Sequence, residues 1–317
     1  MDFGFSLTFA IIAMKSYNDY NTYLKSKYGC KVYRIGLDAG LSCPNRDGTK
    51  GSGGCIYCNE EGSRALYANP ARSVAEQLEE RIAHLKEKAG TKKYIAYFQA
   101  FTNTYAPIKK LKSIYDEIAG FEDIVGISIG TRPDAVDLNK LELIASYKDR
   151  YEVWIEYGLQ SAHDKTLVYL ARGHTVKDFL NAVNLTKKMG ILVSSHVILG
   201  LPNETREDML ETARTLNESK VDSVKIHLLH VLKGSRLEEL YNAGKIRLLE
   251  QDEYVGLVCD FLERLSPHII IQRLTGEGGK SNHVAPAWAL DKLGTIQKIK
   301  ETLEKRKTYQ GYMARNR

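Results

Sequence analysis

Three cysteines, Cys43, Cys55 and Cys58, lie within the segment SCPNRDGTKGSGGCIYCN, residues 42–59. The segment has few apolar side chains, and polar residues and glycines fill the spaces of its C-x11-C-x2-C pattern. Three thiolates on one loop can hold a metal centre. A structural zinc ion takes four protein ligands, and the next histidine, His84, lies in a helical pattern. A 4Fe–4S cluster with one open iron fits three cysteines, because complete ligation takes four thiolates.

The three cysteines are also compatible with a catalytic zinc site. Such an ion could take three cysteines and a water molecule, although no HxE or HExxH element accompanies the loop. Cys30 and Cys259 stand alone, and Cys259 lies in the helical run EYVGLVCDFLERL, where a small core residue is expected. Five cysteines and no export signal favour a reducing compartment, so we expect a cytoplasmic protein.

The elements that position this loop alternate between strand and helix patterns. Strands are predicted at 31–39, 93–100, 124–130, 151–160, 191–200 and 223–231. Helices are predicted from 73, from 107, and at 137–148, 164–171, 175–189, 206–218 and 235–243. Six such units predict a parallel α/β sheet, and six are too few for a complete eight-fold barrel. Since no glycine-rich fingerprint follows the first strand, we expect an incomplete (β/α)6 TIM-type barrel rather than a dinucleotide-binding fold.

The chain divides by these patterns into an N-terminal arm (1–30), a barrel core (31–245, with the cysteine loop at 40–60) and a C-terminal extension (246–317). Residues 1–13 are apolar but carry no basic residue, so they are a packed arm or an upstream start rather than a secretory signal. No apolar run is long enough to span a membrane. The tail from Asp291 to Arg317 has eight Lys/Arg and three Asp/Glu, a charge of 8 − 3 = +5. Such a tail suits phosphate contacts, or is a solvated terminus.

The cysteine loop after the first strand resembles that of the radical S-adenosylmethionine (SAM) superfamily. Tyr57 occupies the aromatic position that the superfamily places before the third cysteine. The spacing between the first two cysteines, Cys43 and Cys55, is longer than the usual superfamily spacing, as in the branch that includes the Elongator catalytic subunit. Longer segments resemble the YhcC/YtqA-type bacterial radical SAM proteins: CPNRDGTKGSGGCIYCN, FQAFTNTYAP, GTRPDAV, WIEYGLQSAHDKTL, RGHT, HVILGLPNET, KIHLLHVLKGS and RLTGE.

The resemblance implies that Cys43, Cys55 and Cys58 ligate one 4Fe–4S cluster, and that SAM chelates the open iron and yields a 5′-deoxyadenosyl radical. It implies further cofactor contacts at Tyr57, Gln99, Asn103, Glu156, Gln160, Leu199, Gly200 and Pro202. Of these, Glu156 would pair with the SAM ammonium group and Gln160 with its ribose or carboxylate. The second strand departs from the family, because FQAFTNT stands where relatives carry a Gly-Gly-Glu-like motif.

Structural roles compete with these assignments. Glu156 and Gln160 share one face of the fourth strand, which in an ordinary sheet is its polar face. His227 and His230 are three apart on the sixth strand, so at most one is expected to face the site, and His196 is an equally open case.

The family resemblance also suggests a substrate. YhcC/YtqA-like proteins are associated with tRNA wobble-uridine modification, in which 5-carboxymethylaminomethyluridine becomes 5-aminomethyluridine, which a partner methyltransferase then methylates. Arg132 or Arg273 would hold the substrate carboxylate, His227 would act in the site, and the basic tail would contact tRNA. A flavodoxin or ferredoxin would supply electrons. A radical SAM enzyme of a small metabolite and a structural metal-binding module are the alternatives.

Overall fold

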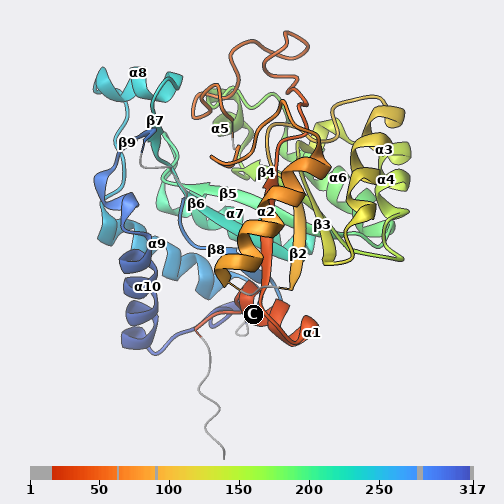
Figure 1. Cartoon of the computed structure of the whole chain (residues 1–317). Helices are drawn as coiled ribbons and strands as arrows, with labels where there is room; N and C mark the ends of the chain where they lie inside the picture. The colour runs from red at the N-terminus through yellow and green to blue at the C-terminus, as the bar shows by residue number, and fades with distance from the viewer. Residues whose placement is uncertain (1–15, 63, 90–91, 277–280, 315–317) are drawn as a thin grey trace, which may run out of the picture.

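The computed structural model describes residues 16–62, 64–89, 92–276 and 281–314, so the prediction for residues 1–13 lies outside the described part. All six predicted strands are present, and a seventh, β8, joins them (Figure 1). Parallel pairing runs in the order β1-β2-β3-β4-β5-β6-β8. The strands are β1 Val32–Leu37, β2 Lys93–Phe98, β3 Ile124–Thr131, β4 Glu152–Gln160, β5 Leu192–Leu199, β6 Ser223–Leu228 and β8 Ile270–Arg273. The predicted incomplete barrel is confirmed.

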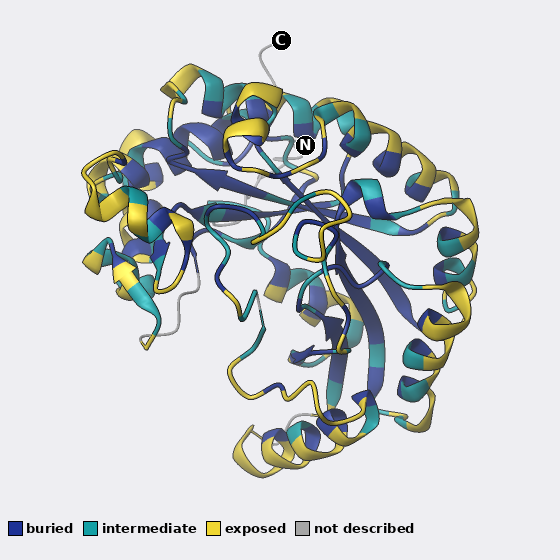
Figure 2. Cartoon of the chain, turned by 90° about the horizontal axis from the view of Figure 1, so that it is seen from above, coloured by how far each residue is buried: buried dark blue, intermediate teal, exposed yellow. Residues whose placement is uncertain are grey.

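The helices that cover the outer face of the sheet match the predicted ones. They are α2 Val74–Ala89, α3 Ile108–Asp116, α4 Leu138–Ala145, α6 Val176–Lys188 and α7 Arg206–Ser219. Figure 2 shows the buried strands inside an arc of helices whose outer faces are exposed. Shorter elements are η1 Glu117–Gly120, η2 Pro133–Ala135, α5 Asp164–Tyr169, α8 Arg236–Asn242, η3 Ala287–Leu290 and the antiparallel pair β7 Val231–Leu232 and β9 His283–Ala285.

Strand alternation separates an apolar outer face from a polar inner face. On β4, Ile155, Tyr157 and Leu159 belong to the core between sheet and helices. Trp154 and Glu156 point to the other face, because successive side chains of a strand alternate. Each fully buried aliphatic or aromatic side chain of the outer face contributes about 1.5–3 kcal/mol. The outer face therefore stabilises the barrel, and the inner face is available for polar groups.

Helix starts are fixed by reciprocal side-chain caps. The predicted box before α2 is present: the Ser73 amide donates to Glu76 over 2.7 Å, and the Glu76 amide donates to Ser73 Oγ over 3.1 Å. The same arrangement begins α6 at Thr175 and α7 at Thr205. Such a cap is worth about 1 kcal/mol, because it satisfies backbone donors that the helix leaves unpaired.

Helix α1, Tyr20–Tyr28, closes the barrel at the N-terminal ends of its strands (Figure 1). The rings of Tyr20 and Tyr23 meet the Trp154 ring edge-on at 6.2 and 6.3 Å. Glu152 accepts a hydrogen bond from Trp154 Nε1 at 2.6 Å and from the Tyr23 hydroxyl at 2.8 Å. The open end of the barrel is therefore the one at which the strands terminate.

The two ends of the described chain meet beside β8. The Ile271 amide donates to the Asn18 carbonyl over 2.8 Å. The Gln310 amide donates to the Ser16 carbonyl over 3.0 Å, and Gln310 Oε1 accepts from the Asn18 amide at 2.9 Å. Helix α9, Gln251–Arg264, and helix α10, Lys292–Arg306, pack against each other next to this junction. Within the described ranges, no helix is both long and apolar enough to cross a membrane.

Candidate active site

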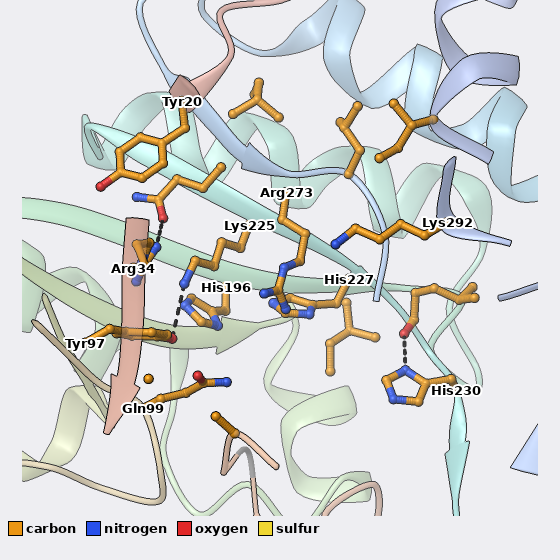
Figure 3. Close-up of a pocket in the computed structure, with 18 of the residues that line it drawn as sticks. Tyr20, Arg34, Tyr97, Gln99, His196, Lys225, His227, His230, Arg273 and Lys292 are labelled. Carbon is orange, nitrogen blue, oxygen red and sulfur yellow. Dashed lines mark hydrogen bonds between the residues drawn. The ribbon is translucent and has the colours of Figure 1, made fainter. Parts of the chain in front are cut away.

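A cavity of about 1350 Å³ lies on the inner face of the sheet. Its wall includes Tyr57 and Cys58 of the cysteine loop, Gln99 after β2, and Gln160 at the end of β4. The same cavity extends past β5, β6 and β8 to Lys292 and Lys300 of α10. Figure 3 shows the polar side chains that converge on it from these elements. The strand ends, as expected for a parallel barrel, bring residues distant in sequence to one place.

Glu156 is the anionic centre of the inner face. Its side chain is fully buried, and it accepts from Ser128 Oγ at 2.6 Å, from His196 Nε2 at 2.8 Å and from Lys225 Nζ at 2.5 Å. The guanidinium of Arg34 forms a further ion pair with it. A buried carboxylate is stable only when paired in this way.

Burial and these contacts shift the pKa values of Glu156 and His196. Burial by itself raises the pKa of Glu156, but the charges of Arg34 and Lys225 hold it well below its usual range. Burial also lowers the pKa of His196 to about 4, with the Lys225 charge acting in the same direction. His196 is thus neutral near pH 7 and donates its Nε2 proton to Glu156.

The inner face around this carboxylate is rich in cations. Lys225 Nζ also donates to the Tyr97 hydroxyl over 3.1 Å and lies 4.3 Å from the centre of that ring. The Arg34 guanidinium lies 3.9 Å from the same ring centre on β2. Arg273 at the end of β8 acts electrostatically on Lys225 and on His196 (Figure 3). Two cations pair with one carboxylate and Arg273 lies near them, so basic groups outnumber acidic ones in this part of the cavity.

The prediction that at most one of His227 and His230 faces the site is wrong, because both line the cavity. β6 ends at Leu228, so strand alternation does not apply to His230. The ring of His227 stacks on His196 at 5.2 Å, and its Nε2 has no hydrogen-bond partner in the described part. His230 Nδ1 lies 3.0 Å from the Leu228 carbonyl.

The cysteine loop lies over the end of the barrel at which the strands terminate. Its last two cysteines form a tight turn, with the Cys58 amide donating to the Cys55 carbonyl over 2.9 Å. The Ile56 amide donates to the Leu170 carbonyl over 3.1 Å and anchors this turn after β4. In the described part, no three His, Cys, Asp or Glu side chains converge as for a single metal ion. A four-iron cluster places each cysteine on a different iron, so its ligands spread more widely than those of one ion.

The thiols are surrounded by donors. Asn45 Nδ2 lies 3.5 Å from Cys55 Sγ, Arg172 Nη1 lies 3.7 Å from the same sulfur, and Arg46 Nη2 lies 3.2 Å from Cys58 Sγ. Burial is the largest influence on Cys55 and raises its pKa, but the charge and hydrogen bond of Arg172, together with the Arg132 charge and the Tyr57 hydrogen bond, lower the pKa below the usual value. Burial dominates at Cys58 and raises its pKa, and the charges of Cys55 and Cys43 act in the same direction. Cys55 and Cys58 therefore lie close enough to influence each other, although their pKa values shift in opposite directions.

Six of the predicted site residues line the cavity: Tyr57, Cys58, Gln99, Gln160, His227 and Arg273. Gln160 has a φ of 71°, an uncommon backbone conformation outside glycine. The side chain of Gln99 packs closely against Gly36 of β1. A Cβ at Gly36 would lie only 2.7 Å from Gln99 Oε1, so a larger residue there would displace the Gln99 side chain. The other predicted residues are not part of its described wall: Cys43, Cys55, Asn103, Arg132, Glu156, Leu199, Gly200 and Pro202. Their predicted roles stay predictions.

Arg132 and Asn103 have structural partners. Arg132 is almost fully buried, and its Nε and Nη2 donate to the two oxygens of Asp134, each at 2.9 Å. Its Nη1 donates to the Arg172 carbonyl over 2.6 Å, so it supports the cysteine-loop side of the barrel. Asn103 Nδ2 donates to the carbonyl of Gly130 over 2.9 Å and to those of Phe98 and Ala100, each over 3.0 Å. Both side chains hold backbone in place.

Leu199 is the last residue of β5, and Gly200 and Pro202 come directly after the strand. Leu199 packs in the core between sheet and helices, whereas its neighbour Ile198 lines the cavity. Gly200 has a φ of 85°, and its amide donates to Met209 Sδ over 3.1 Å. Ile198 was not predicted, although the alternation along the strand could have indicated it.

Two charged residues of the inner face were also not predicted. Arg34 lies in β1 and Lys225 in β6, each between apolar neighbours that face the helices. A charge at an alternate position of an otherwise apolar strand is the signal that could have found them, since a buried charge needs a partner. Arg46 and Arg172, which reach the thiols, carry no comparable signal in the sequence.

The comparisons with known proteins agree with this geometry. Residues 47–216 match the Radical SAM superfamily, and residues 221–305 match the Radical_SAM C-terminal domain. This chain belongs to the radical SAM superfamily. It is a YhcC/YtqA-type member, 41% identical to YtqA of Bacillus subtilis over 94% of the chain and 92% of YtqA. It is also 41% identical to YhcC of Escherichia coli K12, over 84% of the chain and 85% of YhcC.

More distant radical SAM relatives share part of the chain. The tRNA uridine(34) acetyltransferase of Methanocaldococcus jannaschii is 28% identical over 42% of this chain and 25% of its own length. Elongator complex protein 3 of Saccharomyces cerevisiae is 30% identical over 47% of this chain and 27% of its own length. The solved structure of Methanocaldococcus infernus Elp3 has a TM-score of 0.64 at 17% identity, covering 88% of this chain and 64% of that one. This last likeness shows the shared radical SAM fold.

Proposed function

We propose that this radical SAM protein binds one 4Fe–4S cluster through Cys43, Cys55 and Cys58 and binds SAM at the open iron. The observation that carries the proposal is the donor set at the sulfurs: Asn45, Arg46 and Arg172 point polar N–H groups at Cys55 and Cys58. Such donors favour the thiolate, the form that ligates iron: they lower the pKa of Cys55 and partly oppose the burial that raises the pKa of Cys58. When bound, the reduced cluster supplies the electron that cleaves SAM to methionine and a 5′-deoxyadenosyl radical.

The residues of the chain bind, orient and exclude water. Tyr57 and Cys58 lie on the cavity wall, so a ligand at the cysteine loop faces the same space as Gln99 and Gln160. These two amides can donate to and accept from a polar cofactor. A volume of about 1350 Å³ exceeds the usual range for a single small ligand, so it leaves room for a substrate group beside SAM.

We propose tRNA as the substrate, with conversion of 5-carboxymethylaminomethyluridine to 5-aminomethyluridine. Support comes from the tRNA uridine(34) acetyltransferase of Methanocaldococcus jannaschii, which is similar to 42% of this chain. Arg273 faces the cavity beside Lys225, and cations of this kind favour a carboxylate. The cations of α10 are only partly available to tRNA, since Lys298 pairs with Asp252 and Arg306 with Asp260 and Glu263.

The proposal has two separable tests. The first is anaerobic reconstitution, which we expect to give about four irons per chain, with 5′-deoxyadenosine released on addition of SAM and dithionite. A variant with all three loop cysteines changed to Ala should lose both, whereas Cys259→Ala, at a buried core cysteine, should keep both. A tightly bound zinc ion in place of iron would contradict the radical mechanism.

The second test addresses the substrate. Nucleoside analysis of tRNA from a strain lacking the gene should show 5-carboxymethylaminomethyluridine accumulating. Unchanged uridines together with 5′-deoxyadenosine release would reject tRNA and leave a small metabolite as the substrate class. We also propose a flavodoxin or ferredoxin as reductant, a methyltransferase as the next enzyme, and a cytoplasmic location, since free thiols suit a reducing compartment.

A further inference from the structure

Arg172, which follows α5, is a buried cation whose polar contacts include no carboxylate. Only 8% of the residue is exposed. Its Nη2 donates to the Gly158 carbonyl over 3.1 Å, its Nη1 lies 3.7 Å from Cys55 Sγ, and its Nε has no partner in the described part. The acidic groups that influence it are the thiols of Cys55 and Cys43 and the hydroxyl of Tyr57. A buried cation needs an anion, and the cysteine thiolates are the anions within reach.

The backbone of Arg172 is held against the cysteine loop. Its carbonyl accepts from Asn45 Nδ2 at 2.9 Å and from Arg132 Nη1 at 2.6 Å. The residues on either side, Ala171 and Gly173, have φ of 52° and 70°. A Cβ at Gly173 would lie 2.6 Å from Asn45 Oδ1, so glycine is needed for this close approach. The guanidinium is therefore placed at the thiol by several independent contacts.

A second guanidinium, that of Arg46, lies beside Cys58, the other cysteine of the turn. Arg46 Nη2 lies 3.2 Å from Cys58 Sγ, and the same nitrogen donates to the Asn59 carbonyl. Its guanidinium lies 5.4 Å from the centre of the Phe101 ring. Among the ion pairs of the described residues, none involves Arg46 or Arg172. The two arginines come from segments far apart in sequence and meet the same turn.

We propose that Arg172 and Arg46 tune the reduction potential of the cluster by donating charge-assisted hydrogen bonds to the sulfurs of Cys55 and Cys58. The inference rests on the proposed function, since it needs a cluster at these cysteines. Reduction adds one negative charge, so nearby cations and donors stabilise the reduced form and raise the potential. The effect should be strongest at Cys55, which is buried, because charges there are poorly screened, whereas Cys58 is only half-buried.

The test measures the midpoint potential rather than turnover. Reconstituted full-length protein is titrated anaerobically without SAM, and the reduced cluster is followed by its electron paramagnetic resonance signal. We expect Arg172→Gln and Arg46→Gln each to shift the reduction equilibrium at least tenfold toward the oxidised form, a fall of about 59 mV for one electron. Arg172→Lys, which keeps the charge, should fall less than Arg172→Gln. Arg247→Gln is the matched control, because Arg247 is exposed and pairs with Glu253.

The outcomes separate the two proposals. Wild-type protein that binds no iron would overturn the proposed function and this inference with it. Wild-type protein with a cluster, and Gln variants whose potentials equal that of Arg247→Gln, would overturn the inference alone. If Arg172→Gln does not bind a cluster, the midpoint potential of Arg46→Gln tests the inference instead, because Arg46 is only half-buried. A purely structural role would change iron content without lowering the potential of the clusters that remain.

Discussion

Replacing Glu156 by Gln would remove the anionic centre of the inner face while keeping its shape. The carboxylate is fully buried and binds Arg34, Lys225, His196 and Ser128. After the change, two cations would face one another without a carboxylate between them. The lysine is the more affected, because its side chain is 3% exposed against 18% for the arginine.

Breaking a buried ion pair by removing one partner costs about 3–5 kcal/mol. Arg34 keeps its contacts with the Tyr97 ring and with Gln272, so the lower end of this range applies. Lys225 can also lose its proton, since burial has already lowered its pKa well below the usual value. We therefore expect Glu156→Gln to lower the free energy of unfolding by about 3 kcal/mol near pH 7, and by less at higher pH.

The assay is urea unfolding followed by the fluorescence of the two tryptophans, Trp154 and Trp288, and by circular dichroism, on proteins of equal cluster content. The Lys225→Met variant and the double variant complete a cycle. We expect the double variant to be no less stable than Glu156→Gln alone, which gives a coupling of about 1–3 kcal/mol. Glu211→Gln, at an exposed pair with Arg214, should stay within about 0.5 kcal/mol of the wild type. A Glu156→Gln value within that same margin, or strictly additive changes, would refute the reasoning.

Three further expectations follow from the described contacts. Gly173→Ala should lower the free energy of unfolding by about 1–3 kcal/mol and displace Asn45, seen as reduced iron uptake; unchanged stability would show that the loop adapts. His196 has a pKa of about 4 when folded, below the unfolded value of about 6.5, so the unfolded chain binds more protons between these pH values and stability falls as pH drops through them. Denaturation at several pH values should show a shallower fall for His196→Gln, and equal slopes would contradict this. Tyr20→Ala should cost about 3–5 kcal/mol in thermal or urea unfolding, because it removes a buried ring from Trp154, and a loss below 1 kcal/mol would show that α1 is dispensable.

The sequence predicted the strands and helices well because their signals are local. Alternation along the strands and a capping box such as that of Ser73 and Glu76 depend only on neighbouring residues. The family and the cysteine loop were predictable for a similar reason, since their motifs are contiguous. The partners of Glu156 were not, because Arg34 and Lys225 come to it through strand order rather than sequence distance.

The position of Arg132 shows a second limit. The family motif suggests a substrate contact for Arg132, which stays a prediction, and in the structure its guanidinium donates to Asp134 and to the Arg172 carbonyl. Motif membership does not distinguish a residue that touches the cavity from one that holds its wall. His230 shows a third limit. β6 ends at Leu228, so the alternation of side chains along the strand does not apply to His230, and the sequence does not show where a strand ends.

The junction of the chain ends has a consequence for folding during synthesis. Ser16 and Asn18 hydrogen-bond to Gln310, and Asn18 also pairs with Ile271 of β8. These contacts join residues nearly three hundred positions apart, so the sheet edge beside α1 is completed only after both Ile271 and Gln310 have been synthesised. Until then the growing protein exposes an unpaired edge of β6, where β8 later binds. Pairing of β8 with β6 is therefore expected late in synthesis, after the six preceding strands of the sheet have been made.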